Sequence, residues 1–475
     1  MKTSFFLLIT LWVSNVCFGQ NQPVKTPVNI LVIIADDMSK TAGIYGDKTI
    51  STPGIDGVAK DGVIFNNAYC AASSCTPSRG AILTGMYPHQ LKEGGNLWST
   101  LPLSFSNYTT ILSDNGYEIG LEGKGWGPGD FKPGGYKQNP AGPDYKNFEE
   151  FLNKLPLDKP FCFWVGSHDP HRPYEPELKK TVEFNRSALK VQAWLPDNEI
   201  VREDLLDYYA AVKRFDQTVE TTIALLKKKG MYDNTLIIIT SDNGMPFPRV
   251  KANAYVASTN IPLVMRWGNH FMKGKRFNEL VSLVDLAPTI LNVANINVPK
   301  SMTGKTLFPL LVKGKTDKRF DFVFTERERH AKVREGNLSY PVRAVRTKDY
   351  LYIENLRPDR WPAGDPANAE GTGAFGDIDN GPAKQFLIKN RNNPTYKKEV
   401  NLNLEKRPAI ELYDLIKDPN QLNNVADNPV YNKIKKELGA GLAEWRRQTS
   451  DPVINKENEP FDTYPYYGGK RGNNQ

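Results

Sequence analysis

The chain has 475 residues, of which 40% are hydrophobic and 24% are charged, enough for a large domain with a smaller one beside it. The formal net charge of +8 is mild for this length, and Lys and Arg are scattered rather than clustered. We therefore expect no nucleic-acid partner, whereas an anionic small substrate is compatible with this charge.

Residues 1–19 have the pattern of a secretory signal peptide. Lys2 supplies a positive charge, the apolar stretch Ser4–Val16 is too short to span a membrane, and Cys17–Gly19 form a small-x-small cleavage site. The residues before Cys17 make a poor lipobox, which argues against a lipoprotein anchor. No later run is apolar enough to span a membrane. We therefore expect an exported, periplasmic bacterial protein without a membrane partner.

Cysteine usage argues against a disulfide framework. The mature chain keeps only Cys70, Cys75 and Cys162, too few to staple an exported protein of this size. We expect Cys70 and Cys162 to be reduced and buried.

Four short apolar runs have the length of strands, and reactive residues follow each of them at once. The runs are Ile30–Ile34, Tyr117–Leu121, Phe161–Val165 and Leu236–Ile239. Continuous Val, Ile and Phe without alternation predict strands that helices cover on both faces, as in a parallel sheet. In such sheets the active site lies beyond the carboxyl ends of the strands. The residues placed there are Asp36, Asp37, Lys124, His168, His171, Asp242 and Asn243.

Helices are predicted between these strands, and the pattern changes near residue 320. Asp204–Lys229 has apolar residues at helical spacing and ends in cations and a glycine, and a second helix is predicted over Val281–Asn292. We expect an α/β/α sandwich with a mostly parallel central sheet in residues 20–319. Residues 320–475 are expected to form a smaller antiparallel α+β subdomain.

Several short segments define this second part. Its predicted strands are Phe320–Thr325, Val342–Arg346, Tyr350–Glu354 and one that starts at Glu411; Arg357–Pro382 is predicted as a long surface loop and Pro429–Thr449 as a terminal helix.

Cys75 lies in the run Ser73-Ser74-Cys75-Thr76-Pro77-Ser78-Arg79-Gly80-Ala81. Pro77 fits the first turn of a helix that continues to Thr84. A helix N-terminus favours bound anions, and Arg79 adds a fork of donors that suits an oxyanion. By itself the run is also compatible with a buried structural cysteine before a turn.

Two of the predicted strands are each followed by a pair of residues whose side chains offer hard oxygen ligands. Asp36-Asp37 and Asp242-Asn243 offer several carboxylates and an amide oxygen, which suit Ca²⁺ or Mg²⁺ and not Zn²⁺. A single Asp-Asp pair after a strand is more often a cap or a turn. Two such pairs in a chain that also carries the Cys75 run favour a metal site.

The chain has only five histidines, and one of them is needed if a proton must be given to a leaving group. His168 and His171 lie at a strand end, His89 follows the helix that Cys75 opens, and His330 lies at the domain junction. His270 has no motif around it and is expected on the surface. Cations that could offset the charge of an anionic substrate are Arg79, Lys124 and Lys251.

Together these motifs resemble the type I sulfatases of the alkaline phosphatase superfamily over about residues 29–452, and within them the heparan N-sulfatases (sulfamidases). The motifs that carry the resemblance are Ala35-Asp36-Asp37, Cys75-Thr76-Pro77-Ser78-Arg79, Leu83-Thr84-Gly85, Gly116-Tyr117, Gly123-Lys124 and Thr240-Ser241-Asp242-Asn243-Gly244. Those typical of N-sulfatases are Ser167-His168-Asp169-Pro170-His171-Arg172, Met245-Pro246-Phe247-Pro248 and Glu411-Leu412-Tyr413-Asp414.

The resemblance implies an alkaline-phosphatase-like fold and a sulfuric ester hydrolase. A formylglycine-generating (sulfatase-maturating) enzyme would oxidise Cys75 to formylglycine, the nucleophile. One ion, Ca²⁺ rather than Mg²⁺, would be bound by Asp36, Asp37, Asp242, Asn243 and the modified Cys75. The sulfate would meet Arg79, Lys124, Lys251, His168 and His171. The implied substrate is a sulfated oligosaccharide such as an ulvan or glycosaminoglycan fragment, O- or N-sulfated.

The chain departs from the family at one position. Many relatives carry a His two residues after the lysine, and here Trp126 stands at that place. Either another histidine such as His89 supplies the missing donor, or the pocket lacks it. The residues expected to contact substrate are His89, Trp126, Arg172 and His330.

Two other functions remain open. A phosphatase or phosphonate hydrolase of the same superfamily would usually have a Thr or Ser nucleophile and two metals. An inactive glycan-binding relative would be expected to have lost Cys75, Arg79 or Lys124, and all three are present.

Overall fold

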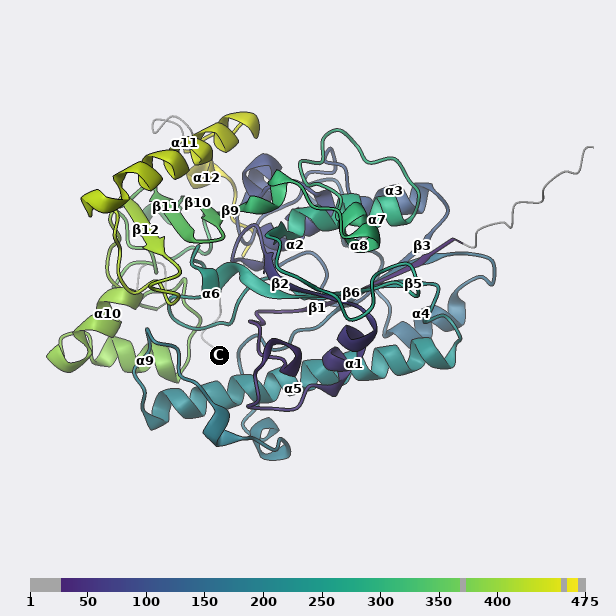
Figure 1. The fold of residues 1–475 in the computed structure, drawn as a ribbon, viewed down its shortest axis with the longest axis horizontal. Helices are drawn as coiled ribbons and strands as arrows, with labels where there is room; N and C mark the ends of the chain where they lie inside the picture. The colour runs from purple at the N-terminus through teal and green to yellow at the C-terminus, as the bar shows by residue number, and fades with distance from the viewer. Residues whose placement is uncertain (1–26, 368–372, 454–458, 469–475) are drawn as a thin grey trace, which may run out of the picture.

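The structure is a computed structural model that describes residues 27–367, 373–453 and 459–468 (Figure 1). The predicted signal peptide, residues 1–19, lies outside the described residues. Among those that are described, we find no helix with the length and apolar content that a membrane crossing requires. Cys70 and Cys162 are buried and unpaired, as expected, and Cys75 is buried as well.

An eight-stranded sheet forms the centre of the molecule, with the order β3-β4-β1-β5-β6-β2-β7 and β8 beside β2. The four predicted runs form β3, β4, β1 and β5, which are neighbours and run parallel. Two strands that we did not predict, β6 and β2, add antiparallel pairs. The strands are β1 Asn29–Ala35, β2 Val63–Tyr69, β3 Glu118–Gly123, β4 Phe161–Gly166, β5 Thr235–Ser241, β6 Asn260–Arg266, β7 Arg276–Phe277 and β8 Val281–Ser282.

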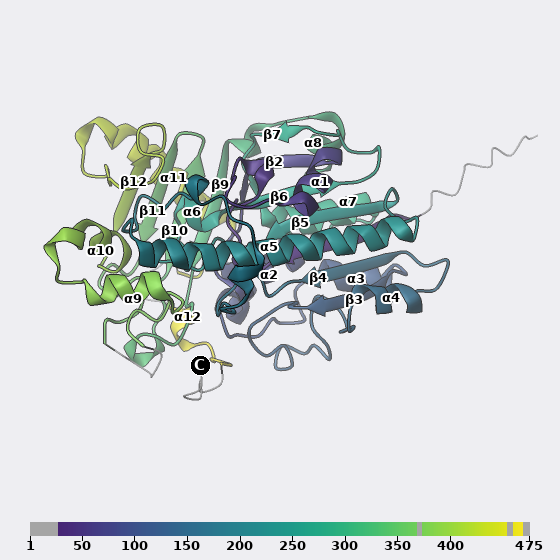
Figure 2. The ribbon, with the colours of Figure 1, turned by 90° about the horizontal axis from the view of Figure 1, so that it is seen from below.

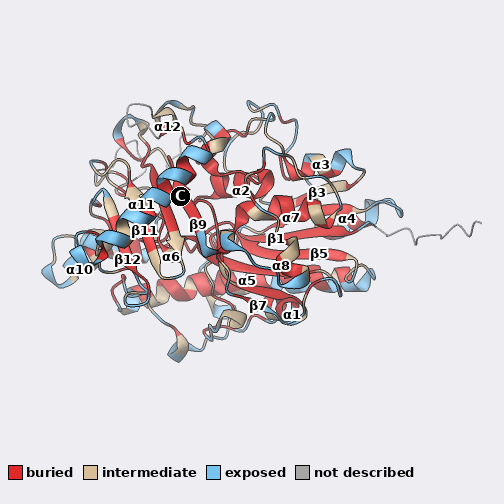
Figure 3. Ribbon diagram, turned by 45° about the horizontal axis from the view of Figure 1, so that its top comes forward, coloured by how far each residue is buried: buried red, intermediate tan, exposed pale blue. Residues whose placement is uncertain are grey.

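Helices cover both faces of this sheet, which confirms the predicted α/β/α sandwich (Figures 1 and 2). Every residue of β1 is buried, and its residues alternate between two core clusters: Leu31 and Ile33 face one, Ile30 and Val32 the other. The first cluster holds α1 Pro53–Asp61, α4 Phe148–Lys154 and α5 Glu199–Lys228, and the second holds α2 Cys75–Thr84, α3 Tyr108–Asp114, α7 Leu286–Val293 and α8 Phe308–Lys313. Figure 3 shows the sheet buried between these layers.

A second, four-stranded antiparallel sheet has the order β12-β11-β10-β9, as predicted for the C-terminal part. Its strands are β9 Phe322–Arg327, β10 Val342–Thr347, β11 Tyr350–Asn355 and β12 Ile410–Asp414. The terminal helix α11, Asn432–Gln448, packs Leu442 and Trp445 against this sheet. The division of the chain near residue 320 stays a prediction.

The segment predicted as a surface loop is largely packed. Ala363, Phe375 and Ile378 are buried in the same core cluster as α5, which corrects that prediction. Helix α9, Pro382–Lys389, continues the contact, since Ala383 N donates to Asp204 Oδ2 of α5 at 3.0 Å. Figure 2 shows α9 beside the start of α5. This packing carries residues near 379 toward the ends of the central strands.

Short elements complete the fold. They are α6 Val256–Thr259, α10 Lys397–Asn403, α12 Pro460–Thr463, and the 3₁₀ helices η1 Gly43–Tyr45, η2 Pro88–Gly95, η3 Leu178–Thr181, η4 Arg186–Ala188, η5 Leu283–Asp285, η6 Lys318–Asp321, η7 Glu335–Asn337, η9 Pro394–Tyr396 and η10 Pro429–Tyr431.

Candidate active site

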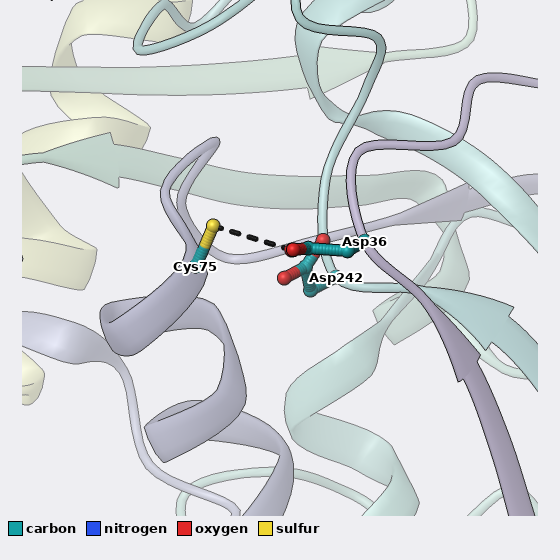
Figure 4. Close-up of side chains that lie close together, drawn as sticks. All are labelled: Asp36, Cys75 and Asp242. Carbon is teal, nitrogen blue, oxygen red and sulfur yellow. Dashed lines mark hydrogen bonds between the residues drawn. The ribbon is translucent and has the colours of Figure 1, made fainter. Parts of the chain in front are cut away.

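Three buried side chains from separate elements point toward one another at the carboxyl ends of the central strands (Figure 4). Asp36 follows β1, Asp242 follows β5, and Cys75 is the first residue of α2. The Cys75 thiol lies 3.5 Å from Asp36 Oδ1. The parallel order of the strands explains the convergence, because strands adjacent in a parallel sheet end at the same edge.

Asp37 and Asn243 complete this group. Asp37 N donates to Asp242 Oδ1 at 3.0 Å, and Asn243 Nδ2 donates to Asp37 Oδ1 at 2.6 Å and to Asp242 Oδ1 at 2.7 Å. Asp37 adopts a left-handed backbone with φ of 71°. Such a conformation costs about 1–3 kcal/mol in a non-glycine residue and is concentrated at functional sites.

The donor set fits a hard divalent cation. Asp36, Asp37 and Asp242 are almost fully buried together. Within the described part of the chain, Asp37 Oδ2 and Asn243 Oδ1 are buried without a hydrogen-bond partner. Buried polar atoms are normally satisfied, and oxygen ligands of this kind suit Ca²⁺ or Mg²⁺. The structure thus brings together all the predicted ligand residues.

Two lysines offset part of this negative charge. Lys124 Nζ lies 2.8 Å from Asp36 Oδ1 and 2.6 Å from Asp36 Oδ2. Lys251 Nζ binds Asp37 Oδ1 and lies 3.6 Å from Cys75 Sγ. Burial acts to raise the pKa of Asp36, but Lys124 and its neighbouring cations hold that pKa well below its ordinary value. Burial raises the pKa of the Cys75 thiol well above its ordinary value, although Lys124 and Lys251 oppose this rise.

Arg79 is fully buried and its hydrogen bonds go to protein acceptors. Its Nε donates to Asp242 Oδ2 at 2.8 Å, and its Nη1 donates to Lys124 O at 2.7 Å and to Gly125 O at 3.1 Å. We expected Arg79 to face the sulfate. In the structure it ties α2 to the residues that follow β1, β3 and β5, since Nη2 also lies 3.4 Å from Asp36 Oδ1. Its role toward the sulfate stays a prediction.

His171 and His168 lie at the mouth of the site. The His171 ring engages Arg172 O through Nδ1, so its Nε2 faces the site, 3.8 Å from Asp37 Oδ2. His168 is more exposed. Partial burial and the nearby Lys124 charge lower its pKa. Both histidines follow β4, as predicted, and His171 lies against the carboxylates.

The structure corrects two of the predicted substrate contacts. His89 is buried, with Nδ1 2.6 Å from Glu326 Oε2 and Nε2 3.3 Å from Thr449 O, so both ring nitrogens are engaged away from the site. Trp126 is 3% exposed and belongs to the core cluster beside α2. Neither side chain replaces the missing histidine donor.

Arg172 and His330 contact residues that neighbour the site. Arg172 Nη1 lies 2.7 Å from Asp204 Oδ1, and its guanidinium stacks 4.6 Å from the Phe247 ring centre. It therefore braces the loop that carries His171. His330 Nδ1 is 2.8 Å from the hydroxyl of Ser74, next to Cys75. Burial lowers the pKa of His330 to about 3, which keeps it neutral.

Asp379 was missed at the sequence level. One of its carboxylate oxygens lies within 4.8 Å of a carboxylate oxygen of Asp37 and of a ring nitrogen of His171, and its Oδ2 is 3.8 Å from Lys251 Nζ. Burial acts to raise the pKa of Asp379, but Lys251 and His171 outweigh it and hold the pKa at about 2. The residue follows a Pro- and Gly-rich stretch with no periodicity, so only its long-range packing reveals it.

Comparisons with known proteins agree with this geometry. The sulfatase family model matches residues 28–296, and the model for the C-terminal region of N-sulphoglucosamine sulphohydrolase matches residues 250–366. Human N-sulphoglucosamine sulphohydrolase is 28% identical over 477 aligned residues, covering 90% of this chain and 91% of the human protein. An ulvan-active sulfatase of Formosa agariphila is also 28% identical, covering 92% of this chain and 84% of its own.

Solved structures support the fold. A structure solved in complex with its substrate D-glucosamine-2-N,6-O-disulfate superposes with a TM-score of 0.64 at 19% identity, covering 92% of this chain and 99% of the other. The match to the sulfatase model spans more than half of the chain and contains helix α2, which begins at Cys75, and the strand-end carboxylates. The chain therefore belongs to the sulfatase family, with an alkaline-phosphatase-like fold, and is a sulfuric ester hydrolase.

Proposed function

We propose that this sulfatase is exported to the periplasm and removes sulfate from sulfated oligosaccharides through a formylglycine made from Cys75. The observation that carries the proposal is the position of Cys75 at the start of α2, with Sγ 3.5 Å from Asp36 Oδ1 and 3.6 Å from Lys251 Nζ. The relatives named for N-sulphoglucosamine and for ulvan both act on sulfated saccharides by name, which supports this substrate class.

The nucleophile requires a modification of Cys75. A buried thiol whose pKa is raised is protonated at neutral pH and is a poor nucleophile. A separate formylglycine-generating enzyme would oxidise it to the aldehyde, and water would add to give a geminal diol. One diol oxygen then has the place of the thiol, between Asp36 and Lys251.

The cation and the lysines prepare the site for an anion. A bound Ca²⁺, held by Asp36, Asp37, Asp242, Asn243 and the modified residue 75, would supply positive charge to the sulfate oxygens. Ca²⁺ accepts an irregular oxygen shell of this kind more readily than Mg²⁺, which demands near-ideal octahedral geometry. Lys124 and Lys251 add fixed charges that stabilise the charge of the transition state.

The reaction then needs one proton donor. A diol oxygen attacks sulfur and the bond from sulfur to the leaving oxygen or nitrogen breaks, while His171 Nε2 gives that atom a proton. The attacking diol oxygen loses its own proton to solvent, and the second diol hydroxyl returns a proton to His171. The carbon–oxygen bond to sulfate then breaks, and the aldehyde and free sulfate result. Water restores the diol.

The alternative function, a phosphatase or phosphonate hydrolase, would usually need a second metal ion. Asp37, His171 and Asp379 form a second group of ligand atoms within 4.8 Å of one another. Lys251 already binds Asp37 and lies 3.8 Å from Asp379 Oδ2. Its ammonium supplies the positive charge that a second cation would supply, which favours a single ion.

His171→Ala is expected to reduce kcat/KM for a sugar sulfate by roughly 10²–10⁴-fold, because a poor leaving group needs its proton. The loss on 4-nitrophenyl sulfate should be at least about tenfold smaller, since a nitrophenolate leaves with little protonation. Steady-state kinetics on both substrates measures the difference. His270→Ala, which changes an exposed histidine stacked on Trp267, is the matched control. Equal losses on both substrates would make His171 a sulfate-binding group and transfer the acid role to His168.

Gly166→Ala should reduce kcat/KM by about 10²-fold or more, because a displacement of about 1 Å in a positioned group has that cost. A Cβ at Gly166 would lie 1.8 Å from Lys124 O, so the chain that carries Lys124 must move. The control is Gly57→Ala on the exposed side of α1, where a Cβ meets nothing within 4 Å. Wild-type kinetics in Gly166→Ala would show that the Lys124 position does not limit the rate.

A further inference from the structure

Asp379 connects the C-terminal part of the chain to the catalytic group. Its Oδ2 lies 3.8 Å from Lys251 Nζ, and the same ammonium lies 3.6 Å from Cys75 Sγ. The carboxylate is thus separated from the nucleophile position by one ammonium group. One of its oxygens also lies within 4.8 Å of a ring nitrogen of His171, the residue proposed to protonate the leaving group.

Asp379 has unused capacity to accept hydrogen bonds. Among the described residues, its Oδ2 is buried with no hydrogen-bond partner, while the side chain as a whole is 20% exposed. Asp377, two residues earlier, is different. It accepts hydrogen bonds from Arg327, from Arg334 Nη2 at 2.6 Å and from Ala331 N at 3.2 Å, so both of its carboxylate oxygens have protein donors. Asp377 is therefore structural, whereas Asp379 lies at the site with its Oδ2 able to accept a hydrogen bond.

The location of Asp379 determines which part of a substrate it meets. In the proposed mechanism the diol oxygen of the modified residue 75 attacks sulfur from one side, and the leaving group departs on the side of His171. A carboxylate beside His171 therefore faces the sugar and not the sulfate. An ionised carboxylate only accepts hydrogen bonds, and it repels an anion placed beside it.

We propose that Asp379 is a specificity-determining residue that accepts a hydrogen bond from an O–H or N–H of the sugar unit carrying the scissile sulfate. Because its carboxylate is negatively charged, Asp379 also disfavours a second anionic group on the part of the sugar next to it. The inference rests on the proposed function, because it requires a sulfated saccharide in the site. The donor is either a hydroxyl next to an O-sulfate or the N–H of an N-sulfated amine.

Kinetics of the Ca²⁺-loaded, formylglycine-containing enzyme tests the proposal. Asp379→Ala and Asp379→Asn are compared with wild type on glucosamine N-sulfate, on O-sulfated sugars with a free, missing or sulfated neighbouring hydroxyl, and on 4-nitrophenyl sulfate. Asn380→Ala, an exposed neighbour, is the control. Loss of a hydrogen bond to a charged group corresponds to roughly 10- to 10²-fold in kcat/KM.

The expected result is a loss in Asp379→Ala that is about tenfold larger for the preferred sugar sulfate than for 4-nitrophenyl sulfate. Asp379→Asn keeps an acceptor oxygen and should lose mainly its discrimination against the doubly sulfated sugar. A selective loss on glucosamine N-sulfate assigns the donor to N–H, and a loss that needs the free hydroxyl assigns it to O–H.

Two results would overturn the proposal. Equal losses on the sugar and the nitrophenyl substrates would make Asp379 a residue that positions Lys251 and His171. Unchanged preference among the sugars in both variants would remove it from recognition. If the wild-type enzyme cleaves 4-nitrophenyl sulfate and no saccharide sulfate, the proposed substrate class fails, and this inference fails with it. Wild-type cleavage of saccharides with unaltered selectivity in the variants overturns this inference alone.

Discussion

Cys75→Ala is expected to lower turnover by at least about 10⁴-fold, because it removes the nucleophile of a covalent mechanism. The fold should persist. Cys75 is the first residue of α2, where alanine is a good helix former, and the thiol makes only long contacts to Asp36, Asp37 and Lys251. Circular dichroism and thermal unfolding measure the fold, and kinetics on sulfated saccharides measures turnover.

Cys70→Ala is the matched control for this prediction, since Cys70 is an equally buried thiol outside the ligand group. That variant should remain active. Peptide mass spectrometry of wild-type protein from a host with a maturation enzyme should show that residue 75 has lost the thiol and gained an aldehyde. A fully active enzyme with an intact Cys75 thiol would refute the formylglycine mechanism.

Asp242→Ala should abolish activity and remove the stabilisation that Ca²⁺ gives the wild-type protein. Asp242 accepts from Arg79 Nε at 2.8 Å, so its loss leaves that buried donor without a partner, while Nη1 and Nη2 keep their contacts with Lys124 O, Gly125 O and Asp36. An unsatisfied buried donor costs about 1–3 kcal/mol. For the wild type, a metal at 100 times its Kd adds about 2.7 kcal/mol of stability. Thermal unfolding with Ca²⁺ and with EDTA measures both effects.

Asp242→Asn separates the two contributions, because the amide keeps the shape and one acceptor while it removes the charge. It should retain more stability without Ca²⁺ than Asp242→Ala and should still lose the response to Ca²⁺. Should chelation leave the rate and the melting temperature of the wild type unchanged, the metal assignment is wrong.

The parts of the fold that could be predicted from sequence are those whose signal is local. β1, β4 and β5 are largely apolar runs and β3 carries a shorter apolar core, and a parallel sheet places the residues that follow these strands at one edge. β2 was missed because Asn66 and Asn67 interrupt its apolar pattern, at the place where its pairing with β6 shifts register. Proline within Asn260–Arg266 likewise obscured β6.

The errors at the site have long-range causes. His89 was one candidate for the missing donor, but its partner Glu326 is 237 residues away in the chain and could not be inferred from neighbours. Asp379 lies in a segment with the composition of a loop, and only the contact of α9 with α5 brings it to Lys251. Trp126 was assigned by its place in a motif, whereas apolar burial decides its position.

The residues proposed for sulfate chemistry and the residue proposed for sugar recognition come from different parts of the chain. The proposed nucleophile, the proposed cation ligands and the two lysines all precede residue 267, whereas Asp379 lies between β11 and β12. If Asp379 contacts the sugar as proposed, sequence change in that later segment would alter the sugar side of the site and leave the sulfate chemistry as it is. A single catalytic apparatus can therefore diversify over many glycans by change confined to one stretch of its chain.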